Sequence, residues 1–165
     1  MTIKVGEKLP EMNFTVMTAD GPKPISTSDV FKGKKVALFA VPGAYTPTCH
    51  KAHMPGFVER VSEIKAKGVD AVVCTAVNDI FVLTNWANDT GAASKITMLA
   101  DGSADFAKAT GLEIDLTKHG LGVRSKRYAM LVDNGVVKVL NVEDAPPAHG
   151  VSSAETMCSL IDRSF

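Results

Sequence analysis

The run Val36–Val41 consists of six consecutive apolar residues and ends at Pro42-Gly43. A short, continuous apolar run that is bounded by turn residues is typical of a strand buried on both faces of a sheet. We therefore expect residues 36–41 to form a central strand. This strand constrains the fold more than any other segment, because both of its faces must be covered by other elements.

Helical and strand patterns alternate after this strand. From Pro47 to Lys67 apolar residues recur at helical spacing, although Pro55-Gly56 is expected to kink or interrupt the helix. Residues 70–77 are rich in Ala and Val and predict a second buried strand, and Asp79 is a cap candidate for the next helix. Since a strand that returns in the same direction needs a helix to carry it back, this order predicts parallel strands with right-handed crossovers.

The C-terminal half predicts strands that pair in the opposite direction. Residues 97–100 favour one more short strand, and residues 128–132 and 136–142 flank Asn134-Gly135. Asn-Gly supplies the positive φ angles of a tight hairpin turn, so these two strands should be antiparallel.

A capping box is expected at Ser152 and Glu155, at the start of a last helix. The helix after Asp79 is expected to bury Phe81 and Trp86 in the core. The resulting order of elements is that of an α/β thioredoxin-like fold with an N-terminal extension, in which a mixed central sheet is flanked by helices. Because Gly and Pro are spread along the chain rather than gathered in a linker, we expect one domain over residues 1–165.

Composition narrows the class of partner and the compartment. The 165 residues include 18 Lys and Arg and 18 Asp and Glu, a balance that argues against a nucleic-acid partner or binding to anionic lipid. No segment approaches the roughly 20 apolar residues of a membrane span, and the first residues do not resemble a signal peptide. Three scattered cysteines do not make a disulfide scaffold, so we expect a protein of the reducing cytosol.

Cys49 is the principal candidate for chemistry. Thr46-Pro47 predicts a helix N-cap followed by a proline at the first helical position, which places Cys49 in the first turn. Unpaired N–H groups and the helix dipole favour a thiolate there, although a free cysteine is often just a small buried hydrophobe. Position 52 is Ala52 rather than a second cysteine, so a thioredoxin-type dithiol is excluded.

These residues match the pattern Pro-x-x-x-Thr-x-x-Cys, and the surrounding segment reads VPGAYTPTCHKAHMPGF. The segment resembles the active site of peroxiredoxins of the Prx5, or plant type II, branch. The resemblance extends to VNDIFVLTNWA, LADGSADFAKATGLEIDL and RSKRYAMLVDNGVVKVLNVE, and so to nearly the whole chain. It implies a thiol-dependent peroxidase that reduces hydrogen peroxide and alkyl hydroperoxides without a metal or an organic cofactor.

The resemblance also implies roles for individual residues. Cys49 is the peroxidatic cysteine, which becomes a sulfenic acid; Thr46 hydrogen-bonds the peroxide and the thiolate; and Pro42 shields the pocket from water. The family's arginine opens a strand that ends six positions later in an acidic or amide residue, a spacing that selects Arg127. We also expect Gly43 and His53 to support the pocket, and Arg124 to be a solvated charge that could assist the site. Gly120–Gly122 is expected to form a loop near the site. An apolar wall or dimer surface is expected at Leu112, Ile114 and Leu116.

The route by which the oxidised cysteine is reduced stays open at this level. Cys74 matches the second cysteine of plant type II members, but a cysteine in an apolar strand is normally buried and inert. Animal members use a cysteine where Ser153 stands here, and Cys158 is expected to pack or face solvent. We therefore favour an external thiol, either glutathione with glutaredoxin or thioredoxin, with Cys74 as the candidate internal resolving cysteine. The resemblance also implies a homodimer.

Two other classes of function compete with the peroxidase. A peroxide sensor or redox-regulated binding protein would use oxidation of Cys49 to change partner binding rather than to turn over. Because Cys49 and His53 lie one helical turn apart, a metal site and a cysteine hydrolase are further alternatives. A zinc site usually has four ligands in pairs, and a hydrolase needs an oriented base and an oxyanion hole; the sequence supplies neither pattern.

Overall fold

A computed structural model describes residues 1–145, 148 and 150–164. It contains the strands β1 (Asn13–Thr18), β2 (Gly21–Ser26), β3 (Lys35–Val41), β4 (Ala71–Ala76), β5 (Thr97–Ala100), β6 (Glu113–Asp115), β7 (Val123–Ser125), β8 (Tyr128–Asp133) and β9 (Val136–Val142). Its α-helices are α1 (Thr27–Phe31), α2 (Met54–Ala66), α3 (Ile80–Thr90), α4 (Asp105–Thr110) and α5 (Ala154–Ser164). Seven strands form one mixed sheet in the order β2-β1-β5-β4-β3-β8-β9, and β6 pairs with β7 alone.

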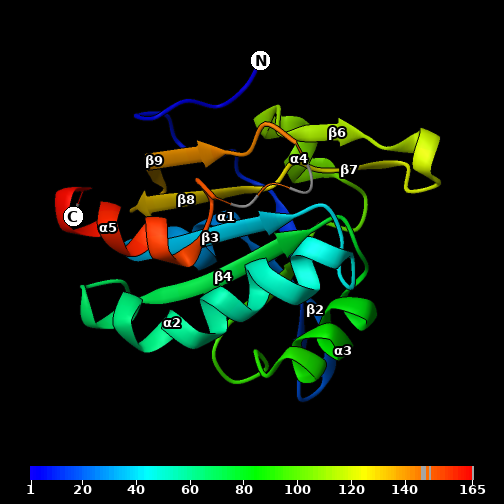
Figure 1. Cartoon of the computed structure of the whole chain (residues 1–165), viewed down its shortest axis with the longest axis horizontal. Coiled ribbons are helices and arrows are strands. Elements are labelled where there is room, and N and C mark those ends of the chain that lie inside the picture. The colour runs from blue at the N-terminus through cyan, green and yellow to red at the C-terminus, as the bar shows by residue number, and fades with distance from the viewer. Residues whose placement is uncertain (146–147, 149, 165) are drawn as a thin grey trace.

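The predicted central strand is confirmed. β3 lies between β4, with which it is parallel, and β8, with which it is antiparallel. β4 pairs in parallel with β5, and α2 and α3 connect these three strands as expected (Figure 1). The β8–β9 hairpin is also confirmed: its turn residues Asn134 and Gly135 have φ angles of 50° and 79°.

The two faces of the sheet are covered by different helices. Alternate residues of β3 point to opposite sides: Ala37, Phe39 and Val41 belong to a core cluster with residues of α2, α3 and α5. Val36, Leu38 and Ala40 belong to a second cluster with residues of the N-terminal segment, α1 and α4. In Figure 1, α2 and α5 lie side by side on the near face. Burial on both faces explains why β3 has no polar residue between Val36 and Val41.

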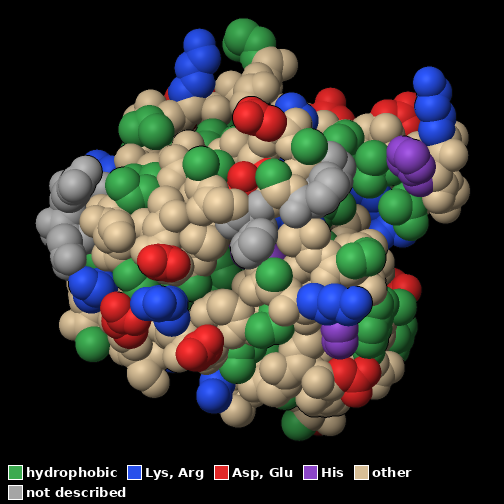
Figure 2. Space-filling model, viewed as in Figure 1, with side chains coloured by type: hydrophobic (Ala, Val, Ile, Leu, Met, Phe, Trp, Pro, Cys, Tyr) green, Lys and Arg blue, Asp and Glu red, His purple; other side chains and the backbone are tan. Residues whose placement is uncertain are grey.

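Several elements were not expected from sequence. The hairpin β1–β2 extends the sheet beyond β5, and α4 follows β5 with Asp101 accepting hydrogen bonds from the N–H groups of Phe106 and Ala107. The small β6–β7 hairpin projects from the body of the protein (Figure 1). Acidic and basic side chains are interspersed over the face in Figure 2. None of the helices in the described ranges is long and apolar enough to cross a membrane.

Two local expectations were wrong. Phe81 is 60% exposed, because the buried positions of α3 are Ile80, Leu83, Trp86 and Ala87 and Phe81 lies off that face. The capping box at Ser152 is absent: the N–H of Thr156 bonds the hydroxyl of Ser153 at 3.2 Å, while the hydroxyl of Ser152 donates to Glu143. Pro55-Gly56, by contrast, does interrupt the helix that begins at Pro47, as expected: a π-helical turn at Cys49–His53 precedes α2, and Pro55 lies in the first turn of α2.

Candidate active site

Cys49 lies where the chain leaves the carboxyl end of β3 and turns into a helix. Pro47 is the first helical residue, as expected, and residues Cys49–His53 then form a π-helical turn in which the N–H of Met54 bonds the carbonyl of Cys49. Pro55 has no N–H to donate and its ring crowds the carbonyl four residues earlier, which accounts for the wider turn just before it. The side chain of Cys49 is fully buried.

Arg127 connects Cys49 to His53. Its Nη2 donates to Sγ of Cys49 at 3.0 Å, and its Nη1 donates to Nδ1 of His53 at 2.9 Å. Since a guanidinium has donors only, Nδ1 of His53 accepts, and the proton of the neutral ring sits on Nε2, which bonds the carbonyl of Ser152 at 2.9 Å. The His53 ring packs edge-on against Phe39 with centroids 5.2 Å apart. The structure therefore aims a buried guanidinium at a buried sulfur.

The loop before Cys49 is held by Arg124. Nη1 of Arg124 donates to the carbonyl of Pro42 at 3.2 Å, and its Nε donates to the carbonyl of Leu121 at 2.8 Å. A Cβ at Gly43 would lie 2.7 Å from Nη1 of Arg124, so glycine leaves room for this side chain. The expectation of a solvated Arg124 is wrong: the residue is half-buried and ties the loop to the β6–β7 hairpin.

A hollow of about 200 Å³ opens beside Arg127 and Thr46. The residues that line it are Pro42, Thr46, Pro47, Thr48, Leu116, Leu121 and Arg127. Leu116 and Leu121 come from the β6–β7 connection, so this hairpin supplies an apolar wall, whereas Leu112 is buried in the core. The hydroxyl of Thr46 donates its proton to the carbonyl of Gly43 at 2.7 Å, so its oxygen acts toward other groups only as an acceptor.

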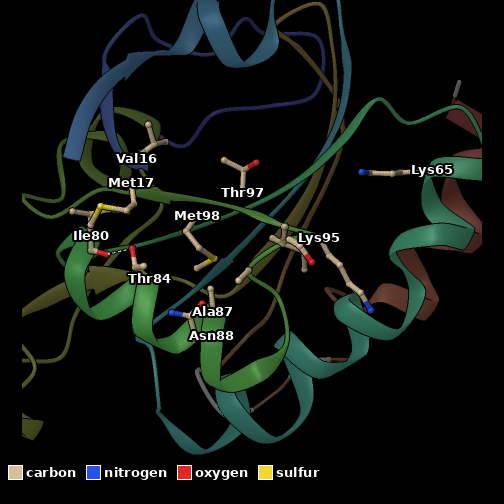
Figure 3. Close-up of a pocket in the computed structure, with 13 residues that line it drawn as sticks. Val16, Met17, Lys65, Ile80, Thr84, Ala87, Asn88, Lys95, Thr97 and Met98 are labelled. Atoms are coloured by element: carbon tan, nitrogen blue, oxygen red, sulfur yellow. Dashed lines mark hydrogen bonds between the residues drawn. The ribbon is translucent and has the colours of Figure 1, made fainter. Parts of the chain in front are cut away.

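A second hollow, of about 380 Å³, lies between α3, β1 and β5 (Figure 3). Val16, Ile80, Thr84, Thr97 and Met98 are among the residues around it, and the hydroxyl of Thr84 bonds the carbonyl of Ile80 across one turn of α3. Its lining contains none of the residues around Cys49. The smaller hollow is lined by Arg127, which bonds the sulfur of Cys49, and is therefore the one suited to chemistry.

His50 packs on the side of the helix that faces α3. Its Nδ1 accepts a hydrogen bond from Nε1 of Trp86 at 3.1 Å, and its ring stacks on Tyr45. Tyr45 has a φ of 65° and donates its hydroxyl to Asp89 at 2.6 Å. Among the described residues, no group of three or more His, Cys, Asp and Glu side chains is arranged to hold a metal ion.

The other two cysteines lie in the same core cluster as Cys49. Cys74 is fully buried in β4, opposite Phe39, and burial together with the nearby Cys49 raises the pKa of its thiol well above the usual value. Cys158 is buried on α5, so of the two expected environments, packed or facing solvent, it has the packed one. Burial and the nearby Glu63 raise the pKa of its thiol. All three cysteines are free thiols.

Sequence reasoning missed the polar groups behind His53. The carboxylate of Glu143, one residue beyond β9, accepts hydrogen bonds from the N–H and the hydroxyl of Ser152. The signal that could have found Glu143 is its position at the end of an apolar strand, where a buried acid needs a partner. Nothing in the spacing of residues 143, 152 and 53 indicates that they meet.

Comparison with known proteins gives the family. The Redoxin family model matches residues 4–158. The chain is 48% identical over 161 residues to peroxiredoxin-2E-2, chloroplastic, from Oryza sativa subsp. japonica, covering 94% of this chain and 71% of that protein. It is 42% identical over 154 residues to peroxiredoxin-2D from Arabidopsis thaliana, covering 93% and 94%.

A solved structure agrees with these relatives. The crystal structure of reduced Prx3 in complex with H2O2 from Vibrio vulnificus superposes with a TM-score of 0.92 at 48% identity, covering 97% of this chain and 99% of that one. The expected thioredoxin-like fold and the resemblance to peroxiredoxins are therefore confirmed. The chain belongs to the redoxin family and, within it, to the peroxiredoxins, the thiol-dependent peroxidases.

Proposed function

We propose that Cys49 is the atom-transfer centre of this peroxidase. The Cys49 thiolate attacks one oxygen of a peroxide, so that an S–O bond forms as the O–O bond breaks. The sulfur loses two electrons and becomes a sulfenic acid, and the departing oxygen takes a proton to give water or an alcohol. The observation that carries this proposal is the 3.0 Å hydrogen bond from Nη2 of Arg127 to Sγ of Cys49 in a buried site.

Fixed donors explain how the site accelerates this step. Negative charge builds on the departing oxygen, and donors that are already aimed at it stabilise the transition state more than the ground state. Arg127 supplies such donors, with a permanent charge in a rigid fork. The hydroxyl of Thr46 donates to Gly43, so next to the hollow it serves as an acceptor for the O–H of the peroxide. We propose that Pro42 excludes water, that Gly43 and His53 support the site, and that the apolar wall of Leu116 and Leu121 admits alkyl hydroperoxides as well as hydrogen peroxide.

Peroxide consumption by Cys49→Ser tests this assignment. We expect the variant to lose reductant-coupled peroxide consumption, while the matched variant Cys158→Ser retains it. Sustained consumption by the unaltered protein over many equivalents of peroxide separates an enzyme from a sensor, which would be oxidised once. If Cys49→Ser keeps the activity, the assignment of Cys49 is wrong.

We propose that an external thiol reduces the sulfenic acid. One thiol forms a disulfide with Cys49 and releases water, and a second thiol then frees the cysteine. The burial of Cys74 and the raised pKa of its thiol support an external reductant over internal attack, because the thiolate is the attacking species. Glutathione with glutaredoxin and thioredoxin are the two candidates, and the rates of turnover with each will decide between them.

We also propose a homodimer in the cytosol, built from one domain per chain. The exposed side chains of Tyr45 and Phe81, 44% and 60% accessible, offer apolar surface to a second copy. The free thiols of all three cysteines are compatible with a reducing compartment. Sedimentation velocity of the reduced protein tests the dimer. The even mixture of charges supports small peroxides and protein thiols, rather than nucleic acid or a membrane, as partners.

A further inference from the structure

Glu143 is a buried acid that the peroxidase reaction does not use directly. It follows β9 and is 9% exposed. Its Oε2 accepts hydrogen bonds from the N–H of Ser152 at 2.7 Å and from the hydroxyl of Ser152 at 2.5 Å. Its own N–H donates to the carbonyl of Arg127 at 2.9 Å. Glu143 therefore contacts the backbone of Arg127 and, with its side chain, the residue that bonds His53.

Ser152 connects Glu143 to the guanidinium of Arg127 through hydrogen bonds of His53. Its carbonyl accepts the Nε2 proton of His53 at 2.9 Å, which leaves Nδ1 of the neutral ring without a proton and able to accept from Nη1 of Arg127. In the other tautomer, a proton on Nδ1 would face the Arg127 donor, and the guanidinium would have to turn away from Cys49. The position of one carbonyl thus selects the tautomer that keeps Arg127 on the sulfur.

We propose that Glu143 and Ser152 are positioning residues for Arg127, a role that rests on the proposed function of Arg127 and Cys49. The Glu143 carboxylate fixes the backbone of Ser152, Ser152 fixes the His53 tautomer, and His53 fixes the guanidinium. An anion suits this place because it accepts two hydrogen bonds at one oxygen, and charge-assisted bonds are stronger than neutral ones. Neither residue touches the peroxide.

Three variants and a control separate positioning from general damage. Glu143→Leu removes both side-chain acceptors, Ser152→Ala removes one donor but keeps the backbone links, and Glu143→Gln keeps an acceptor oxygen. Glu155→Gln changes an exposed acid at the start of α5 and serves as the control. For each protein we would measure the rate constant for oxidation of Cys49 by peroxide and, separately, the rate constant for its alkylation by iodoacetamide.

The expected result is a split between the two rates. Loss of a positioning hydrogen-bond pair should lower peroxide oxidation about tenfold in Glu143→Leu, with a smaller loss in Ser152→Ala. Glu143→Gln should recover most of the rate and Glu155→Gln should match the unaltered protein. Alkylation, which needs no donor for a departing oxygen, should fall less than peroxide oxidation. Equal losses in both rates, or no recovery with glutamine, would overturn the positioning role.

A nitrogen-15 spectrum of the imidazole rings tests the same role without any peroxide. We expect His53 to carry its proton on Nε2 in the unaltered protein and in Glu143→Gln, and to sample the Nδ1 tautomer most in Glu143→Leu and less in Ser152→Ala. This measurement remains informative if Cys49 proves not to react, so a failure of the proposed chemistry and a failure of the positioning role are distinguishable. An unchanged tautomer in both Ser152→Ala and Glu143→Leu would refute the inference.

Discussion

Replacement of Arg127 by alanine should slow the oxidation of Cys49 more than any other change outside the sulfur itself. Nη2 of Arg127 and Sγ of Cys49 are 3.0 Å apart and both groups are buried. For a guanidinium and a thiolate at this distance, the attraction at an effective dielectric of about 20 is about 5.5 kcal/mol. Solvent entering the space left by the side chain recovers part of this energy.

The change in rate depends on the attraction between Arg127 and the departing oxygen, because negative charge leaves the sulfur and builds on that oxygen in the transition state. Removing one fixed donor from a developing anion typically costs roughly 2.7–4 kcal/mol, which corresponds to about a hundredfold to a thousandfold in rate. We expect Arg127→Ala to lose peroxide reactivity by this factor. Arg127→Lys keeps the charge but cannot bond both His53 and Cys49 with the same geometry, so it should fall in between.

Stopped-flow fluorescence measures this rate directly. Trp86 is the only tryptophan and donates to His50, the neighbour of Cys49, so its emission should respond when the sulfur is oxidised. Arg124→Ala is the control, because Arg124 bonds the carbonyls of Pro42 and Leu121. We expect that variant to lose less than about tenfold, a limit set by one or two hydrogen bonds. Equal losses for the two arginines, or less than a tenfold loss for Arg127→Ala, would refute the reasoning.

Three further predictions follow from the contacts. In Gly43→Ala the new Cβ would displace Nη1 of Arg124, 2.7 Å away, so the variant should lose a few-fold in peroxide reactivity. In an Arg124→Ala background the further loss should be smaller, since only the 3.2 Å contact with Cγ2 of Thr46 then remains. Burial raises the pKa of the Cys74 thiol above 9.0, so the unfolded chain releases this proton at a lower pH than the folded protein does. The unfolding free energy should therefore fall as pH rises above about 9, by at most about 1.4 kcal/mol per pH unit from this group. In denaturant titrations over this pH range, the unfolding free energy of Cys74→Ala should fall less steeply than that of the unaltered protein. Tyr45→Phe removes the hydroxyl that donates to Asp89 and should speed alkylation of Cys49 by loosening the loop; an unchanged alkylation rate would count against this role.

Local patterns in the sequence predicted the centre of the fold. The apolar run that became β3, the Asn134-Gly135 turn and the Pro47 helix start depend on nearby residues, and each was confirmed. The buried position of Phe81 was wrong because the helical period alone, without the packing partners, does not decide which face of α3 is covered. The β6–β7 hairpin was missed because strands of three residues carry too little pattern to detect.

The candidate site was predicted unevenly for the same physical reason. Cys49 and Thr46 lie in one short motif, and the resemblance supplied Arg127 by its spacing to Asp133; the structure brings Arg127 to the sulfur and Arg124 to the loop. The contacts of Glu143 and Ser152 with each other and with His53 could not be predicted, because they join segments far apart in the chain. Hydrogen bonds that hold a reactive group in place arise from tertiary packing, and they leave no periodic pattern in the local sequence.

Mass spectrometry of the reduced protein after one equivalent of hydrogen peroxide, with dimedone present to trap sulfenic acid, tests the central claim most directly. We predict a single dimedone adduct on the peptide that contains Cys49, with the peptides of Cys74 and Cys158 unmodified. An adduct on either of those two peptides in place of Cys49, or an unoxidised Cys49 after the peroxide has been consumed, would contradict the account.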